Sequence, residues 1–196
     1  MRANLRVNLR QFMAELQRSR GMITGRLDSR FSGPLSDLLS ENASGDPQSA
    51  AVTGAYTAAI NGYLRGELKY PGDDRYTMGG GVEWNWVREG QRGWASATYV
   101  GSDLVQAMVN NPNLRIEVEN GYYDLATPFY ATEYTVDHLS GLSAALRSRI
   151  ALKYYEAGHM MYLREADLAK LKENVARFIT TTTKPAAPAT SGGGGN

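Results

Sequence analysis

The sequence contains no cysteine and only two histidines. Without thiols the chain has neither a disulfide framework nor a thiolate metal site. The absence leaves the cellular compartment open, because cytosolic and periplasmic proteins can both lack cysteine. The two histidines, His138 and His159, lie far apart in the sequence and form no customary ligand pattern with carboxylates. We therefore expect no metal site, and no motif in the sequence indicates a cofactor.

The chain also lacks an excess of charge and any long apolar segment. Its formal net charge is +1, which gives no overall field that would attract nucleic acid or an acidic membrane surface. No apolar run approaches the roughly 20 residues that cross a bilayer, and the polar start MRANLRVNLRQ is not a signal peptide. We expect neither nucleic acid nor a membrane as a partner. The composition favours no particular oligomeric state.

The residues that are present suit one ordinary domain. A chain of 196 residues, 42% apolar and 21% charged, is large enough for a core of normal size. Helical spacing of apolar residues predicts helices at about 1–18, 47–68, 102–110, 128–138 and 168–179. Expected helix starts are Asp46-Pro47, Ser102 and Thr127-Pro128. Two short apolar segments, 114–121 (LRIEVENG) and 149–155 (RIALKYY), predict strands, and GRLDSRFSGP predicts a loop or short strand.

The order of these elements in the second half of the chain is helix, strand, helix, strand, helix. This order is typical of an α/β fold, in which helices pack on a parallel sheet. We expect a mostly helical segment over residues 1–95 and the α/β portion over residues 96–180. The low-complexity tail, residues 181–196, cannot build a core and is expected to be disordered.

Both predicted strands end in a glycine-containing turn with a chemically capable side chain just beyond. The first is followed by Asp124 in NGYYDLATPF, and the second by His159 in YYEAGHMMY. Neighbouring parallel strands lie about 4.8 Å apart, so a carboxylate and an imidazole on these two loops can meet. An aspartate that accepts a hydrogen bond from a histidine ring orients that ring as a general base. Taken singly, the aspartate fits a turn former and the histidine a loop residue, while His138 fits a helix end.

These two motifs resemble the carboxyl-terminal part of the serine carboxypeptidases, peptidase family S10, in its bacterial branch. GRLDSRFSGP, DPQSAAVTGAYTAAINGYLRGELKY and DLVQAMVNNPNLRI extend the resemblance over roughly residues 4–180. The resemblance implies the carboxyl-terminal portion of an α/β-hydrolase fold, parallel strands with flanking helices, preceded by a mostly helical insertion over the active site.

The same resemblance implies the chemistry, in which a serine attacks the last peptide bond of a peptide substrate and releases the C-terminal residue. Asp124 would be the triad aspartate and His159 the general base and acid. Met160 would line the pocket for the released residue, and Tyr123 and Gly158 would shape the two loops.

The nucleophile that this chemistry requires has no counterpart in the sequence, because no serine lies in a G-x-S-x-G elbow. We expect the chain to be part of a longer enzyme and inactive alone, or a short protein that lost catalysis. Two strands make a marginal sheet with unprotected edges. Glu117 and Glu119 on one face of the first strand also depart from the apolar pattern of a buried strand.

Two other interpretations remain open at this point. Trp84, Trp86 and Trp94 in an aromatic stretch fit a non-catalytic interaction module, although ordinary packing of the inserted segment is the favoured explanation of such residues. In the second interpretation the chain is part of another hydrolase of the same fold, such as an esterase, which would use the same aspartate and histidine on a different acyl substrate.

Overall fold

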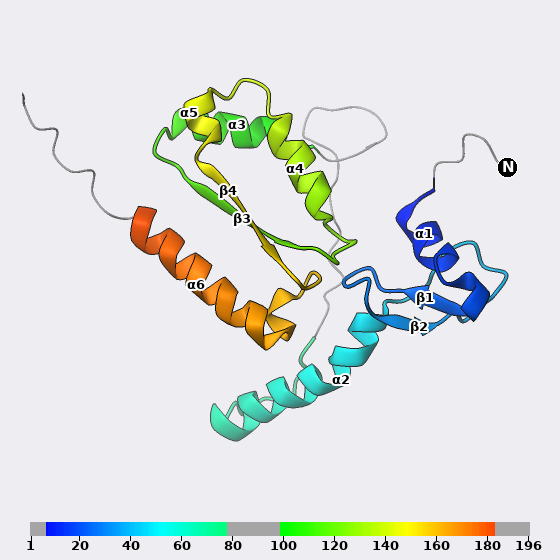
Figure 1. The fold of residues 1–196 in the computed structure, drawn as a ribbon. Coiled ribbons are helices and arrows are strands. Elements are labelled where there is room, and N and C mark those ends of the chain that lie inside the picture. The colour runs from blue at the N-terminus through cyan, green and yellow to red at the C-terminus, as the bar shows by residue number, and fades with distance from the viewer. Residues whose placement is uncertain (1–6, 78–98, 183–196) are drawn as a thin grey trace, which may run out of the picture.

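The structure is a computed structural model that describes residues 7–77 and 99–182 (Figure 1). Its helices are α1 (Leu9–Glu15), α2 (Pro47–Gly62), α3 (Gly101–Asn110), α4 (Phe129–Asp137), α5 (Ala144–Arg147) and α6 (Glu165–Thr182). Its strands are β1 (Met22–Thr24), β2 (Ser32–Pro34), β3 (Ile116–Gly121) and β4 (Ile150–Tyr155). Short 3-10 turns cover Arg18–Arg20 and Met161–Leu163, and a π-helical turn, Tyr63–Glu67, prolongs α2.

The second half of the chain folds around the parallel pair β3 and β4. The pairing runs in register from Ile116 opposite Ile150 to Gly121 opposite Tyr155. Helix α6 lies along one face of this pair, and α3 and α4 lie on the other side (Figure 1). The predicted parallel sheet between helices is confirmed, and this part of the protein has α/β character.

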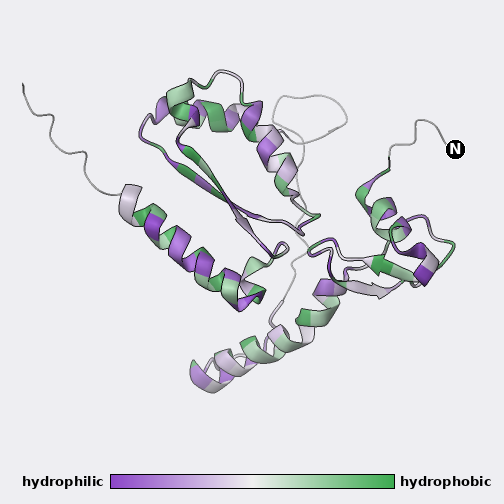
Figure 2. Cartoon of the chain, in the orientation of Figure 1, coloured by the Kyte–Doolittle hydropathy of each residue, from purple (hydrophilic) through white to green (hydrophobic). Residues whose placement is uncertain are grey.

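The two faces of the β3–β4 pair hold their helices through different contacts. On one face, the Tyr155 hydroxyl accepts a hydrogen bond of 2.8 Å from Asn174 of α6. On the other, the Tyr154 hydroxyl donates to Glu133 of α4 at 2.6 Å, which raises the pKa of Tyr154 to about 12. Helix α6 carries both hydrophilic and hydrophobic residues along its length (Figure 2), so it is amphipathic as its sequence predicts.

The acidic residues of β3 lie on the face that α6 covers, and they find polar partners there. Glu119 accepts a hydrogen bond of 2.6 Å from the Tyr155 hydroxyl. Glu117 lies 3.9 Å from the Lys153 ammonium. Burial raises the pKa of Glu119, the hydrogen bond from Tyr155 opposes this shift, and the neighbouring Glu117 adds to it. These groups replace the apolar cover that the pattern of β3 lacks. The strand begins at Ile116, two residues later than predicted, and ends at Gly121 as predicted.

The first part of the chain packs around a small antiparallel hairpin. Strands β1 and β2 pair antiparallel, with Ile23 opposite Gly33, in the region predicted as loop or short strand. Helix α1 begins after Asn8, whose side chain caps it together with Gln11. A core cluster joins the helix to the hairpin and consists of Met13, Ala14, Ile23, Leu35 and Ala43.

Helix α2 begins where the Asp46-Pro47 pattern predicts. The Asp46 side chain accepts a hydrogen bond of 3.0 Å from Ser49 N–H, and Pro47 occupies the first turn. The same carboxylate accepts hydrogen bonds from the backbone of Arg26 and Leu27, at 2.6 and 3.1 Å. Asp46 therefore ties the start of α2 to the loop between β1 and β2.

Two predicted helix caps are wrong in detail. Helix α3 starts at Gly101 with Val100 as its N-cap residue, so Ser102 lies inside the first turn and does not cap it. Helix α4 has Pro128 itself in the N-cap position, without a side-chain cap. The hydroxyl of Thr127 instead donates to the Asp124 carboxylate, three residues earlier in the chain, and so does not cap the helix.

Helix α6 continues through Thr182, so residues 181 and 182 are helical and do not belong to the predicted disordered tail. Residues 183–196 and the tryptophans at 84, 86 and 94 lie outside the described residues. Within 7–77 and 99–182, no helix combines the length and the apolar character that crossing a membrane requires.

Candidate active site

The carboxyl ends of β3 and β4 bring together the aspartate and the histidine that the sequence singles out. His159 Nδ1 lies 2.8 Å from Asp124 Oδ2. The backbone pairing of the strands continues into their loops, because Tyr122 N–H donates to the Tyr155 carbonyl and Tyr123 N–H to the Ala157 carbonyl, both at 3.0 Å. The two loops are therefore held in fixed register as they leave the sheet.

Asp124 is buried and accepts four hydrogen bonds. Its Oδ1 atom accepts from the backbone of Ala126 at 2.7 Å and of Thr127 at 3.0 Å. Its Oδ2 atom accepts from the Thr127 hydroxyl at 2.6 Å and from His159. Both oxygens of the carboxylate are thus fixed in place, which sets the direction in which Oδ2 faces the imidazole.

The hydrogen bonds also decide the charge of Asp124. Burial by itself raises the pKa of Asp124, but the hydroxyl and backbone of Thr127, the imidazole of His159 and the backbone of Ala126 more than offset that effect. The pKa of Asp124 therefore lies below its ordinary value. The stabilisation that this carboxylate gives the fold is complete above the ordinary value and is lost as pH falls through the lowered one.

His159 combines a fixed backbone with an accessible ring. Its N–H donates to the Leu27 carbonyl at 2.7 Å, and its side chain is 46% exposed. An ionised Asp124 can only accept, so in the neutral form of the His159 ring Nδ1 carries the hydrogen and Nε2 carries the free lone pair. Among the described residues Nε2 has no hydrogen-bond partner. The arrangement can take a proton from a group that approaches Nε2 and return it later.

The remaining residues that the resemblance singles out lie beside this pair. Met160 is partly buried and its carbonyl accepts from Leu163 N–H at 3.0 Å, at the start of a 3-10 turn. Tyr123 is 38% exposed, and the Arg30 guanidinium lies 4.4 Å from its ring centroid. The other histidine, His138, ends α4 and its Nδ1 lies 2.7 Å from the Tyr134 carbonyl, as predicted.

Gly158 allows three segments of backbone to meet next to His159. A Cβ atom on Gly158 would lie 2.4 Å from the Leu27 carbonyl oxygen and 2.5 Å from Asp28 Cβ. A Cβ atom on Gly121, at the end of β3, would lie 2.4 Å from the Gly158 carbonyl oxygen. Glycine is required at both positions by close backbone approach, and neither neighbour is a flexible side chain that could move aside.

We expect Gly158→Ala to lower the free energy of unfolding by about 3 kcal/mol, because the added methyl group overlaps backbone and displaces the Leu27 carbonyl from His159 N–H. Gly54→Ala is the matched control. Gly54 lies inside α2 with nothing within 4 Å of an added Cβ, so alanine there raises the unfolding free energy by up to about 1 kcal/mol. Urea unfolding followed by circular dichroism measures both, and equal stability of the two variants would contradict the close approach.

Sequence reasoning missed the segment between β1 and β2 as part of this site. Arg26 accepts at its carbonyl a hydrogen bond of 3.0 Å from Leu125 N–H, and Ser29 N–H donates to the Tyr123 carbonyl at 2.9 Å. These contacts fall on the residues directly before and after Asp124. The only local signal in the sequence is the pair Asp28 and Arg30 in GRLDSR. Their spacing of two residues does not by itself indicate a contact with a distant loop.

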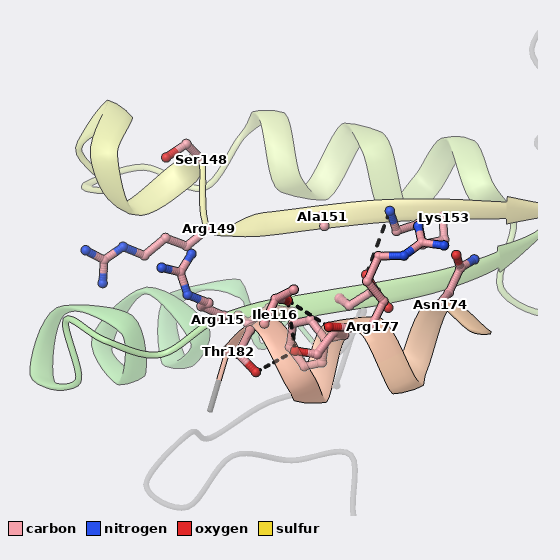
Figure 3. A pocket seen from close by; sticks show the side chains of 12 residues that line it. Arg115, Ile116, Ser148, Arg149, Ala151, Lys153, Asn174, Arg177 and Thr182 are labelled. Atoms are coloured by element: carbon pink, nitrogen blue, oxygen red, sulfur yellow. Dashed lines mark hydrogen bonds and ion pairs between the residues drawn. The ribbon is translucent and has the colours of Figure 1, made fainter. Parts of the chain in front are cut away.

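A cavity of about 240 Å³ lies at the opposite end of the sheet, where β3 and β4 begin. Figure 3 shows Arg115 and Arg149 side by side at the start of the two strands, while Ala151, Lys153 and Asn174 lie farther along. No residue of the loops that carry Asp124 and His159 lines this cavity, so it is separate from the candidate active site. In the part of the chain that the structure describes, no three metal-ligating side chains gather into a metal site.

No protein-family model, no curated protein and no solved structure matches this chain.

Proposed function

We propose that this chain supplies the aspartate and histidine of a serine-type carboxypeptidase that releases C-terminal residues from peptides. The observation that carries the proposal is the 2.8 Å contact between His159 Nδ1 and a buried, fully hydrogen-bonded Asp124. The contact lies at the carboxyl ends of two parallel strands, where α/β proteins place their chemistry. The resemblance of the two motifs supports the substrate class, a peptide with a free C-terminus. It also supports the finer assignment to an α/β-hydrolase fold.

In the proposed reaction, Nε2 of His159 takes the proton of a serine hydroxyl as the serine oxygen attacks the carbonyl carbon of the last peptide bond. The imidazolium formed is stabilised by Asp124 and gives its proton to the nitrogen of the departing C-terminal residue. Water then attacks the acyl-enzyme with His159 again as base, which frees the shortened peptide and restores the serine.

The serine hydroxyl has to reach Nε2 of His159 from another polypeptide segment. The described residues place no hydroxyl within hydrogen-bond distance of that nitrogen, and the sequence contains no G-x-S-x-G elbow. We call the chain together with a segment that carries the serine elbow the assembled enzyme. An esterase with the same pair differs only in the acyl substrate that the assembled enzyme accepts.

The isolated chain is expected to show no peptidase activity and no labelling by a serine-directed fluorophosphonate, because a hydroxyl without a paired base is a weak nucleophile. Intact-mass spectrometry after exposure to the reagent measures the labelling, and release of leucine from an N-blocked dipeptide measures the activity. The assembled enzyme is expected to be labelled at the elbow serine. Stoichiometric labelling of any serine in this chain alone would refute the assignment of the nucleophile.

A further inference from the structure

We propose that Arg30 is a positioning residue, whose guanidinium clamps together the two loops that carry Asp124 and His159. Its role in catalysis rests on the proposed function, whereas its effect on the geometry of the pair does not. The residues Arg26–Arg30, which we call the clamp segment, form most of the loop between β1 and β2. They come from the first part of the chain and lie across both loops of the candidate active site.

The clamp begins with a two-pronged contact inside the segment. Arg30 Nε donates to Asp28 Oδ1 at 3.0 Å, and Arg30 Nη2 donates to Asp28 Oδ2 at 2.6 Å. Asp28 is only 1% exposed, and Asp28 Oδ1 also accepts from Arg30 N–H at 2.9 Å. A bidentate pair of this kind fixes the plane of the guanidinium as well as its position.

The fixed guanidinium then reaches both loops of the candidate active site. Its Nη1 atom donates to the Glu156 carbonyl at 2.9 Å, in the loop that leads to His159. Its central carbon lies 4.4 Å from the ring centroid of Tyr123, next to Asp124. One cation therefore bonds the backbone of one loop and lies over the aromatic ring of the other.

Backbone hydrogen bonds from the clamp segment reinforce the same arrangement. The carbonyl of Leu27 accepts from His159 N–H at 2.7 Å, and the bonds at Arg26 and Ser29 hold the neighbours of Asp124. The segment itself is held by the Asp46 carboxylate, which accepts from two of its backbone N–H groups. The position of His159 relative to Asp124 is thus set by a third piece of backbone that Arg30 orients.

Lysine cannot replace Arg30, because the hydrogen bonds to Asp28 and to the Glu156 carbonyl need three donors in one plane. The guanidinium bonds both oxygens of Asp28 and the Glu156 carbonyl at once. An ammonium is a point charge on a flexible stem and can pair with the carboxylate without reaching the carbonyl in the same geometry. A structural role through charge alone would tolerate lysine, so the two side chains separate a charge effect from a positioning effect.

The test compares Arg30→Ala, Arg30→Lys and the control Arg115→Ala, which lies at the far end of β3. Nitrogen and proton NMR of the His159 ring in the isolated chain reports its tautomer and the exchange of the Nδ1 hydrogen with solvent. Wild type and Arg115→Ala are expected to hold a single Nδ1–H tautomer with a protected hydrogen. Arg30→Ala and Arg30→Lys are expected to lose the protection, and guanidinium ion, well below denaturing concentration, is expected to restore it only in Arg30→Ala.

The inference is overturned if Arg30→Lys, or a folded Arg30→Ala, keeps the His159 signature of the wild type. Should Arg30→Ala fail to fold by circular dichroism, Arg30→Lys carries the test alone. In the assembled enzyme, Arg30→Lys is expected to lower kcat by about 100-fold with little change in KM, because a small displacement of the base impairs proton transfer. An assembled enzyme without peptidase activity, combined with the expected NMR result, would refute the proposed function and support the clamp.

Discussion

His159→Ala is expected to lower the kcat of the assembled enzyme by a factor on the order of 10⁶. The imidazole is the only group that the described residues place to move a proton at the reacting centre, with Nδ1 held by Asp124 and Nε2 accessible. Without it the serine has no base for attack and the departing amine has no acid. The rate of leucine release from an N-blocked dipeptide, measured at saturating substrate, tests this expectation.

His138→Ala is the matched control, since it removes the only other imidazole of the chain. His138 is exposed, ends α4, and stacks on Tyr134 with ring centroids 3.9 Å apart. Loss of this contact is expected to leave turnover unchanged. Near-normal turnover in His159→Ala would remove the histidine from the mechanism, while equal losses in both variants would mean that the effect comes from folding and not from chemistry.

The meeting of Asp124 and His159 is the part of the structure that followed most directly from sequence. Two short apolar segments in a helix–strand order predict parallel neighbours, and parallel neighbours place their carboxyl ends at one edge. The observed strands end at Gly121 and Tyr155, within the predicted segments. Once the register of the two strands is fixed, Asp124 and His159 follow their strands by only a few residues and must therefore lie close to each other.

The clamp segment was beyond the reach of the same reasoning. Arg30 and the Glu156 carbonyl are separated by 126 positions in the chain, and periodicity reports only which face of a local element is apolar. A short, mostly polar loop between two strands of three residues gives no such signal. Its docking depends on backbone hydrogen bonds, which any sequence can offer, on the close approach at Gly158, and on side-chain contacts of Arg30 and Asp46 with residues far away in the sequence.

The acidic face of β3 illustrates a second limit of pattern reasoning. A strand that is covered on both faces is expected to be apolar throughout, so Glu117 and Glu119 argue against a buried strand when the sequence alone is considered. The structure supplies Lys153 and the hydroxyl of Tyr155 from the adjacent strand. Pairing partners across a parallel sheet are known only after the register is known, so a pattern read along one strand cannot include them.

Asp124→Asn is expected to lower the kcat of the assembled enzyme by about 10⁴-fold. Asparagine keeps one oxygen for the backbone of Ala126 and Thr127, which together fix Oδ1 at 2.7 and 3.0 Å. Its amide nitrogen then faces His159 in place of Oδ2 and can only donate. The imidazole must accept at Nδ1 and carry its hydrogen on Nε2, so the nitrogen that should take the serine proton is already protonated.

Two measurements separate this tautomer effect from a loss of stability. Nitrogen NMR of the isolated chain is expected to show the Nε2–H tautomer of His159 in Asp124→Asn and the Nδ1–H tautomer in the wild type. Asp137→Asn is the matched control, because Asp137 is exposed near the end of α4 and its removal takes away the same charge. We expect that control to keep both the wild-type tautomer and full turnover. An Asp124→Asn variant that retains the Nδ1–H tautomer would show that Asp124 does not orient the ring, since a donor at that position is incompatible with a second donor facing it.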